Sequence, residues 1–374
     1  MSSLINVFGI LMLIMLMPIQ GQVVKMVMVE EESQVLKGPI VSGQVNNQII
    51  FQDIGTGKVW DVELTDVSRL FQFSPNGCDV VVLQSFEGDT KIGTLSIFDF
   101  SFKELPPLGT PIWTLDNENI IFLSYNGTTQ STKIYISNNK GEGLVLLNTI
   151  NEAMLFPQWL SNDELIYQSD GYEWLVWNIK TNNISNFYNE SEIIPNEFSQ
   201  QPFYNTSNIS PDHKMIAGFF DFTSFRGATS DNTSEGITEL MPLKPQIPGF
   251  DIFFMKENTR LHVDISEQFI QSLVWASTSS KIAITTDYDG PDYGVFVYDL
   301  KKNRLQRLGD AYNDYQFYIP SWSSNDEWLA FRTPNGYIAQ HLLDGNTISL
   351  DKRLTAHQLF WSPIMDYSNT ICSP

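Results

Sequence analysis

The sequence predicts an all-β fold, a seven-bladed β-propeller closed by pairing of its C-terminal strand with its N-terminal blade. Three observations predict it. A segment made of an aromatic or apolar anchor, a short polar turn and an apolar strand recurs along the chain, its period is roughly 40–50 residues, and the two chain ends carry complementary parts of one repeat. The anchors are Phe73, Trp113, Trp159, Ile209, Trp275, Trp322 and Trp361. Six blades are the alternative if the N-terminal repeat is irregular.

The composition suits such a ring. The chain has 374 residues, of which 42% are hydrophobic and 13% aromatic, enough to bury a large core. Repeats that close into a ring form one domain whatever their number, so we expect residues 22–374 to be a single domain. The formal net charge of −21 repels phosphate backbones and anionic membrane surfaces. Nucleic acid is therefore not an expected partner.

Residues 1–21 contain a mostly apolar run from Leu4 to Ile19. Such a run is typical of a secretory signal peptide and is short for a membrane-spanning helix of about 20 residues. No Lys or Arg precedes it, and Ile19-Gln20-Gly21 is a poor cleavage sequence, so an N-terminal membrane anchor is the alternative. Either way we expect a secreted, periplasmic or cell-surface protein, with no membrane insertion beyond such an anchor.

Each repeat supplies four strands. The strand after an anchor begins about seven residues on, as Val80 does after Phe73, and a constant offset indicates a constant hairpin. Alternating apolar stretches such as Leu95–Phe100 and Val295–Leu300 are third strands, and short stretches such as Leu144–Leu147 are fourth strands. Four strands per repeat make one propeller blade.

The chain ends predict how the ring closes. Near the N-terminus, Gln48–Gln52, Lys58–Leu64 and Asp66–Leu70 are expected to be second, third and fourth strands without an anchor strand before them. Leu359–Pro363 is an anchor strand without a blade after it. Pairing the two fragments into one blade would remove exposed sheet edges.

The turns after the anchors resemble a known repeat. The runs Phe73–Gly77, Ile209–Asp212, Trp322–Asp326 and Trp361–Pro363 are similar to the W-S-P-D-G repeat of TolB-like propellers, and the similarity covers nearly all of residues 40–365. The resemblance implies the propeller fold. It implies little about activity, because propellers of this kind include binding platforms, accessory domains of peptidases and enzymes.

An acidic loop is the candidate metal site. Asp287, Asp289 and Asp292 lie close together beside Gly290, and such carboxylates are ligands that calcium prefers. Asp-Gly is also ordinary hairpin-turn chemistry, so a simple turn is the competing interpretation. No other cofactor is expected.

Two further segments are candidate binding elements. The stretch Asp221–Gly249 lengthens the fifth repeat, and Phe225 and Arg226 near its start are the predicted contacts. A second group of aromatic residues precedes the anchor of the last complete blade, and aromatic side chains with polar tips suit peptide or glycan recognition. Its members are Tyr312, Tyr315 and Tyr318. Both segments are expected on the ring face that carries the acidic loop.

No catalytic motif stands out. The histidines are scattered at positions 213, 262, 341 and 357, and neither an H-E-x-x-H nor a G-x-S-x-G sequence occurs. The predicted function is therefore an exported, non-catalytic and monomeric propeller that binds a protein, peptide or glycan. The alternative is a glycan hydrolase or lyase with carboxylates at the central channel.

The two cysteines are a candidate disulfide. Cys78 follows the first anchor, and Cys372 follows the last one. If the ring closes as predicted, both lie on the face opposite the long loops, where an exported protein could oxidise them.

Overall fold

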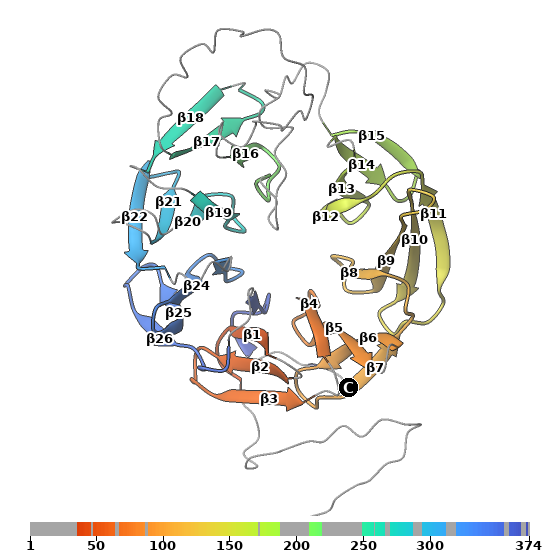
Figure 1. Cartoon of the computed structure of the whole chain (residues 1–374), viewed down its shortest axis with the longest axis horizontal. Helices are drawn as coiled ribbons and strands as arrows, with labels where there is room; N and C mark the ends of the chain where they lie inside the picture. Colours follow the sequence, from red (N-terminus) through yellow and green to blue (C-terminus); the bar gives the residue numbers. More distant parts are fainter. Residues whose placement is uncertain are drawn as a thin grey trace, which may run out of the picture.

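The protein, in a computed structural model, is a ring of seven antiparallel sheets arranged around a central axis (Figure 1). The structure describes residues 36–45, 48–63, 67–86, 89–170, 173–187, 209–218, 249–257, 259–265, 270–286, 294–311, 319–354, 359–367 and 372. The predicted all-β fold and the predicted seven blades are confirmed. We number the blades from the one that contains β1.

Each blade runs from an innermost strand to an outermost strand. Blade 1 is β27 (Phe360–Trp361), β1 (Ile40–Val45), β2 (Gln48–Asp53) and β3 (Val59–Glu63). Blade 2 is β4 (Val67–Phe73), β5 (Asp79–Phe86), β6 (Asp89–Ser96) and β7 (Phe102–Leu105). Blade 3 is β8 (Thr110–Trp113), β9 (Asn119–Asn126), β10 (Ser131–Asn138) and β11 (Val145–Ile150). Blade 4 is β12 (Leu155–Ser161), β13 (Glu164–Gln168), β14 (Trp174–Asn178) and β15 (Asn183–Asn186).

The remaining blades follow the same order. Blade 5 is β16 (Met215–Gly218), β17 (Gly249–Phe254) and β18 (Thr259–Asp264), with Ile209 bridged to Ile216 at the innermost position. Blade 6 is β19 (Ile270–Trp275), β20 (Lys281–Thr286), β21 (Val295–Asp299) and β22 (Arg304–Gly309). Blade 7 is β23 (Ser321–Trp322), β24 (Trp328–Thr333), β25 (Gly336–His341) and β26 (Thr347–Ser349).

The ring closes through blade 1, as predicted, but with a different second strand. Trp361 of β27 pairs with Val41, and Phe360 pairs with Ser42, so the neighbour of the last strand is β1 and not Gln48–Gln52. Gln48–Asp53 is the third strand of this blade, and Val67–Phe73 is the innermost strand of blade 2. The prediction missed β1 because Ser42, Gly43 and Gln44 interrupt its apolar pattern.

The core lies between the blades. In β2, Ile49 and Phe51 pack toward blade 2 while Ile50 packs toward blade 7, and all three side chains are fully buried. The same holds for Val80, Val81 and Val82 of β5, which is why the middle strands are continuous apolar runs and do not alternate. Buried clusters of this kind join every pair of neighbouring blades in the described part of the ring.

Tryptophan anchors also join neighbouring blades through hydrogen bonds. The indole Nε1 of Trp159 donates to the Trp113 carbonyl oxygen at 2.7 Å, and that of Trp361 donates to the Ser321 carbonyl oxygen at 2.8 Å. Trp322 donates to Val274 at 3.0 Å in the same way. These three tryptophans therefore fill the space between innermost strands and satisfy a backbone carbonyl of the preceding blade. The anchor Trp113 differs, because its buried Nε1 has no hydrogen-bond partner among the described residues.

In four of the described turns, one hydroxyl directly after the anchor holds the polar turn; the residues are Ser74, Thr114, Ser210 and Ser323. Ser74 Oγ donates to Asn76 Oδ1 at 2.7 Å and accepts from the Asp79 amide at 3.0 Å, which closes the first turn of blade 2. Thr114 takes the same role in blade 3, donating to Asp116 Oδ1 at 2.6 Å. The Trp113-Thr114 repeat thus keeps the chemistry of the turn although it departs from the W-S-P pattern.

Blade 6 lacks this hydroxyl, because Ala276 follows its anchor at the position where blades 2 and 3 have Ser74 and Thr114. A carboxylate from the next blade replaces it. Asp326 Oδ1 accepts from the Ser277 amide at 2.7 Å, and Oδ2 accepts from the Thr278 amide at 2.8 Å. The hydroxyls of both residues donate to the same carboxylate, which is only 2% exposed as a residue. Asp326 thereby ties the turn of blade 6 to that of blade 7.

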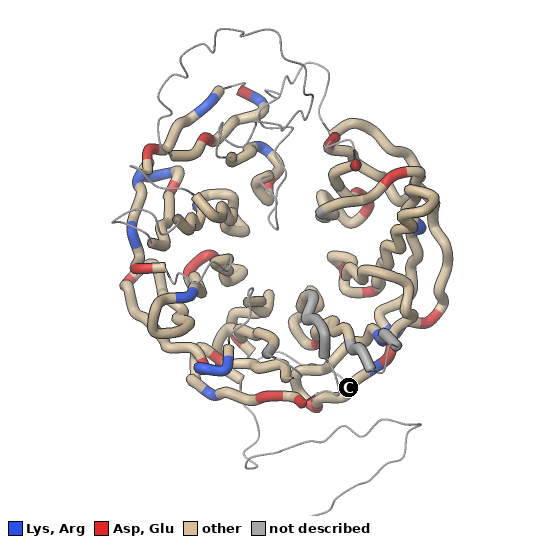
Figure 2. The backbone as a smooth tube through the Cα atoms, viewed as in Figure 1, with Lys and Arg blue, Asp and Glu red and all other residues tan. Residues whose placement is uncertain are grey.

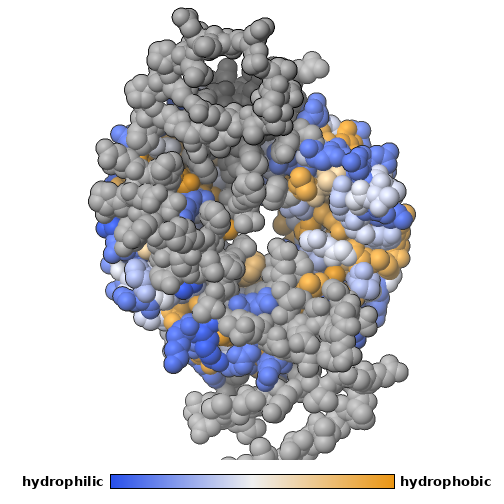
Figure 3. All heavy atoms as spheres, in the orientation of Figure 1, coloured by the Kyte–Doolittle hydropathy of each residue, from blue (hydrophilic) through white to orange (hydrophobic). Residues whose placement is uncertain are grey.

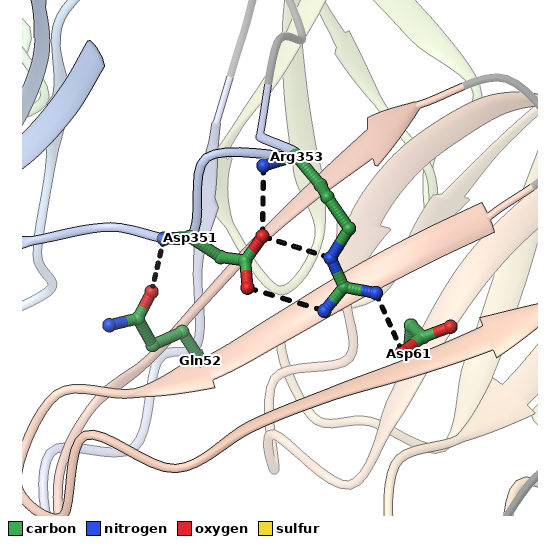
Figure 4. A network of polar contacts seen from close by, with 4 residues as sticks. All are labelled: Gln52, Asp61, Asp351 and Arg353. Carbon is green, nitrogen blue, oxygen red and sulfur yellow. Dashed lines mark hydrogen bonds and ion pairs between the residues drawn. The ribbon is translucent and has the colours of Figure 1, made fainter. Parts of the chain in front are cut away.

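A polar network crosses the closing seam between blades 7 and 1 (Figure 4). Arg353 donates from Nη1 to Asp61 Oδ1 of β3 and from Nε to Asp351 Oδ1, each at 2.9 Å. The Asp351 amide donates to Gln52 Oε1 of β2 at 2.8 Å. Hydrogen bonds from Arg353 lower the pKa of Asp351, so the carboxylate stays charged. The seam is held by these contacts in addition to the short pairing of β27.

Candidate functional site

The long connections of the ring leave it on one face. Strands alternate in direction within a blade, so second-to-third connections and blade-to-blade connections start from the same end of the sheets. Residues 219–248 and 287–293 are connections of the first kind, and 188–208 and 312–318 are of the second kind. We call the ring face bounded by Gly218, Gly249, Thr286 and Gly294 the insertion face, and the opposite one the turn face.

The predicted ligand contacts fall within these connections and lie outside the described residues. They are Phe225, Arg226, Tyr312, Tyr315, Tyr318, Asp287, Asp289 and Asp292. Their roles in binding a ligand or calcium stay predictions. Within the described ranges, no group of three or more His, Cys, Asp or Glu side chains is placed to hold a metal ion.

The base of the acidic loop is a regular hairpin end. The Thr286 amide donates to the Gly294 carbonyl oxygen at 3.1 Å, and the Gly294 amide donates to Thr286 Oγ1 at 2.9 Å. The loop with the three aspartates is thus carried on two paired strands, β20 and β21, at the insertion face.

A buried carboxylate lies at the base of the longest insertion. Asp251 of β17 is two residues after Gly249, and its side chain is only 4% exposed. It bonds to two residues of β18: Oδ1 contacts His262 Nδ1 at 3.0 Å, and Oδ2 accepts from Arg260 Nη2. The side chains of Arg260 and His262 are 45% and 34% exposed, so a buried acid holds two basic groups at the surface.

The hairpin register brings these three residues together. Asp251 pairs directly with His262, and Arg260 lies two residues away on the same face of β18. Gly249 makes room for the imidazole, because a Cβ at this position would lie 3.1 Å from His262 Cε1 and 2.1 Å from the Val263 carbonyl oxygen. The imidazole of His262 is therefore held between Gly249 and Asp251.

The orientation of His262 gives it a chemical role. With Nδ1 facing the carboxylate, Nδ1 carries the proton of the neutral imidazole and Nε2 is a hydrogen-bond acceptor. Nε2 has no hydrogen-bond partner among the residues that the structure describes. We call Asp251, Arg260 and His262 the blade 5 cluster. Arg260 offers a cation, and His262 offers a base or acceptor.

This cluster is not apparent when the histidines are considered as isolated residues in the sequence. A usable signal exists. Asp251 and His262 lie symmetrically about a tight turn between two apolar stretches, and residues opposite one another across a hairpin face the same way. To use this symmetry one must know the register of the hairpin, which follows from the position of the turn at Met255–Glu257.

The innermost strands contain no acidic residue. β4, β8, β12, β19, β23 and β27 carry neither Asp nor Glu. Facing carboxylates on these strands would favour an enzyme that works in the channel. The strands bear Ser, Thr, Gln, Pro, aliphatic and aromatic residues, and one cation, Arg69 of β4. Figure 2 shows the acidic residues spread over all parts of the ring.

The turn face is occupied by contacts within the protein. The Asp212 amide donates to Ser279 Oγ at 2.8 Å, and Ser324 Oγ donates to the Pro363 carbonyl oxygen at 2.9 Å, so neighbouring turns are tied together. Tyr367, which follows β27, donates its hydroxyl to the Gly77 carbonyl oxygen of blade 2 at 2.9 Å. Burial raises the pKa of Tyr367, so the hydroxyl remains a donor.

The cysteine pair lies beside this contact. Cys78 and Cys372 are joined by a disulfide bond, with Cα atoms 5.6 Å apart and a sequence separation of 294 residues. The bond fixes the segment after β27 to blade 2 on the turn face, opposite the insertions.

In the described part of the chain, no helix is long and apolar enough to cross a membrane.

Comparisons with solved structures show the same fold. An oligogalacturonate lyase from Vibrio parahaemolyticus matches with a TM-score of 0.53 at 10% identity, over 82% of this chain and 92% of that one. An oligogalacturonate lyase in complex with manganese matches with a TM-score of 0.51 at 9% identity, over 82% and 89% of the two chains. TolB from Acinetobacter baumannii matches with a TM-score of 0.43 at 14% identity, over 87% and 83%.

No protein-family model matches the chain, and no characterised protein matches it in sequence. At identities this low, the structural likeness concerns the fold alone. The chain is thus a seven-bladed β-propeller, and its TolB-like repeat stays a resemblance.

Proposed function

We propose that this protein is a non-catalytic β-propeller that binds a protein, peptide or glycan on its insertion face. The observation that carries the proposal is the contrast between the two faces. Every connection that exceeds a short turn starts from the insertion face, whereas on the opposite face the turns of blades 5, 6 and 7 and the turn of blade 2 bond to a neighbouring turn or to the segment after β27. Loops held on a rigid scaffold are where binding residues gather.

The blade 5 cluster supports the proposal with a specific contact. Arg260 and His262 are half-exposed and are held by a buried carboxylate, so a ligand would meet groups whose positions are already set. An acidic group on the ligand could pair with Arg260, and a hydroxyl could donate to His262 Nε2. Both properties fit an acidic peptide or an acidic glycan. Export through residues 1–21 belongs to the same proposal.

A binding experiment with two variants tests it. The full chain is applied to an immobilised panel of defined peptides and oligosaccharides, beside a variant in which a short Gly-Ser linker replaces residues 221–247. We expect the wild type to retain one ligand class and the linker variant to lose it by at least tenfold. Lys302→Ala is the control, because this exposed lysine lies in a turn of the opposite face. Equal binding by the linker variant would contradict the proposal.

A second candidate function is enzymatic, and one observation favours it. Asp251 orients His262 with Nε2 facing outward, the arrangement of an imidazole that accepts a proton from a substrate. Incubation of the same oligosaccharides with the protein, followed by mass spectrometry, separates the two functions. Products that require His262 and disappear in His262→Gln would show an enzyme, and intact bound ligand would show a binding protein.

A further inference from the structure

The outer flank of blade 3 carries an unusual apolar strand. Leu144, Val145 and Leu146 are consecutive, and they are 40%, 55% and 50% exposed. The last two belong to β11, the outermost strand of its sheet. Apolar side chains are visible on this flank of the ring in Figure 3, on the side where Figure 1 places β10 and β11.

The free edge of β11 lacks the usual protection. Among the described residues, β11 pairs with β10 alone, so its other edge presents unpaired backbone groups. Proteins protect such edges with charged side chains. The outer strands β3, β7 and β22 have them in Asp61, Lys103 and Arg304, whereas β11 has none. The shorter outer strands β15 and β26 also lack charged residues.

The local charge is also different from that of the whole chain. Residues 127–150 contain two lysines, Lys133 and Lys140, and one acidic residue, Glu142, which gives this stretch a net charge of +1. The chain as a whole has a net charge of −21. Two copies of so acidic a protein repel one another over most of their surface, and the repulsion is weakest where the local charge is not negative.

We propose that β11 is the interface of a homodimer in which two copies pair their β11 edges in antiparallel fashion around a two-fold axis near Val145. An antiparallel pair of identical strands is self-complementary, so it satisfies the backbone groups of both edges. In this register Val145 faces its own copy, Leu144 faces Leu146 of the second copy, and no like charges of β11 stand opposite one another.

The pairing is confined to the Leu144–Leu146 end of the strand. The register between β10 and β11 shifts between Ile134 and Tyr135, which leaves Leu147 without a partner and bends the strand beyond it. A contact of this length is a small interface, so a weak dimer is expected, with a dissociation constant on the order of 10 µM. The dimer replaces the monomer that the sequence suggested and would give the protein two insertion faces for one multivalent ligand.

Sedimentation velocity of the full chain between about 1 and 100 µM tests the proposal. The wild type should shift from monomer to dimer across this range, and a double variant with Val145→Lys and Leu146→Lys should stay monomeric throughout. Leu343→Lys is the matched control, because Leu343 is an isolated apolar residue with 74% exposure in a turn of blade 7. It should dimerise like the wild type.

Three results would overturn the proposal. The first is a wild type that is monomeric at every concentration, and the second is a dimer that persists in the double variant. Because all variants keep the N-terminal residues, a persistent dimer would assign the association to another part of the chain. The third is a monomer whose β11 edge binds an added apolar strand peptide, which would make the edge a docking site for a different protein.

Discussion

Asp326 should be the most sensitive single residue of the turn face, because blade 6 has no hydroxyl of its own at Ala276 and relies on this carboxylate. Asp326→Ala removes the acceptor of two backbone amides, those of Ser277 and Thr278. The two hydroxyls have other partners, since Ser277 Oγ also donates to the Ser324 carbonyl oxygen at 2.8 Å and Thr278 Oγ1 contacts Ser280 Oγ at 2.7 Å. Asp326→Ala therefore leaves mainly the two backbone amides without a hydrogen-bond acceptor.

The magnitude follows from these contacts. A buried donor left without a partner costs about 1–3 kcal/mol, and both amides are partly buried, so we take about 1–1.5 kcal/mol for each. Asp326 has a φ of +57°, a left-handed conformation that Asp tolerates better than Ala, which adds up to about 1 kcal/mol for the alanine. We expect Asp326→Ala to lower the free energy of unfolding by about 2–4 kcal/mol. Asp326→Gly, which relieves the backbone, should cost about 1 kcal/mol less than the alanine.

Equilibrium unfolding in urea, followed by tryptophan fluorescence, measures the difference. The matched control is Asp212→Ala, because Asp212 occupies a similar turn in blade 5 but its carboxylate bonds within that turn and is 37% exposed. It should cost less than about 1 kcal/mol. Ala276→Ser should restore part of the loss in Asp326→Ala by supplying the missing hydroxyl. Equal effects of the Asp326 and Asp212 substitutions would refute the idea that the carboxylate replaces the hydroxyl.

Two other predictions concern the start of β5. Burial, and then the nearby Asp99, raise the pKa of Asp79 from 3.8 to about 6. The folded protein therefore binds the proton of the Asp79 carboxyl more tightly than the unfolded chain does. The stability that this proton contributes is lost as the pH rises from about 4 to about 6. Asp79→Asn should therefore stabilise the protein at pH 7 by about 1–2 kcal/mol and have no effect near pH 4. Midpoints of urea unfolding measure this difference. A difference that does not depend on pH would contradict the raised pKa of Asp79. For the bond between Cys78 and Cys372, thiol titration of unfolded, unreduced protein should detect no free thiol, whereas two free thiols would exclude it.

The blades could be predicted from the sequence because their physical cause repeats. Each anchor fills the same space between two innermost strands, as Trp159, Trp322 and Trp361 do with the same indole hydrogen bond, so the spacing of the anchors reports the spacing of the blades. β1 was missed because of its irregular apolar pattern and also because of its place in the chain. Its innermost partner, β27, lies at the other end of the chain, so no anchor precedes Ile40–Val45 to mark it.

The candidate site could be predicted only in its position. Topology alone places the insertions on one face, and that much follows from counting strands between them. The contact of Asp251 with Arg260 and His262 depends on the register of one hairpin and on the absence of a side chain at Gly249, and neither leaves a repeating pattern in the sequence. The side chains of the insertions are outside the repeat altogether, so the repeat carries no information on their ligand.

Under the proposed function, recognition belongs to the insertion face, whereas the turn face carries contacts that join the blades. Bonds between neighbouring turns, the Asp326 carboxylate and the cysteine pair all lie on the turn face, where a substitution disturbs the ring. On the insertion face, the acidic loop is joined to the ring through an ordinary hairpin end formed by Thr286 and Gly294. A scaffold of this kind allows its ligand to change while its fold is kept. The blade 5 cluster is the informative exception, because it is a polar site built into the strands themselves, and the proposed role in binding would explain why a buried acid holds two exposed basic side chains there.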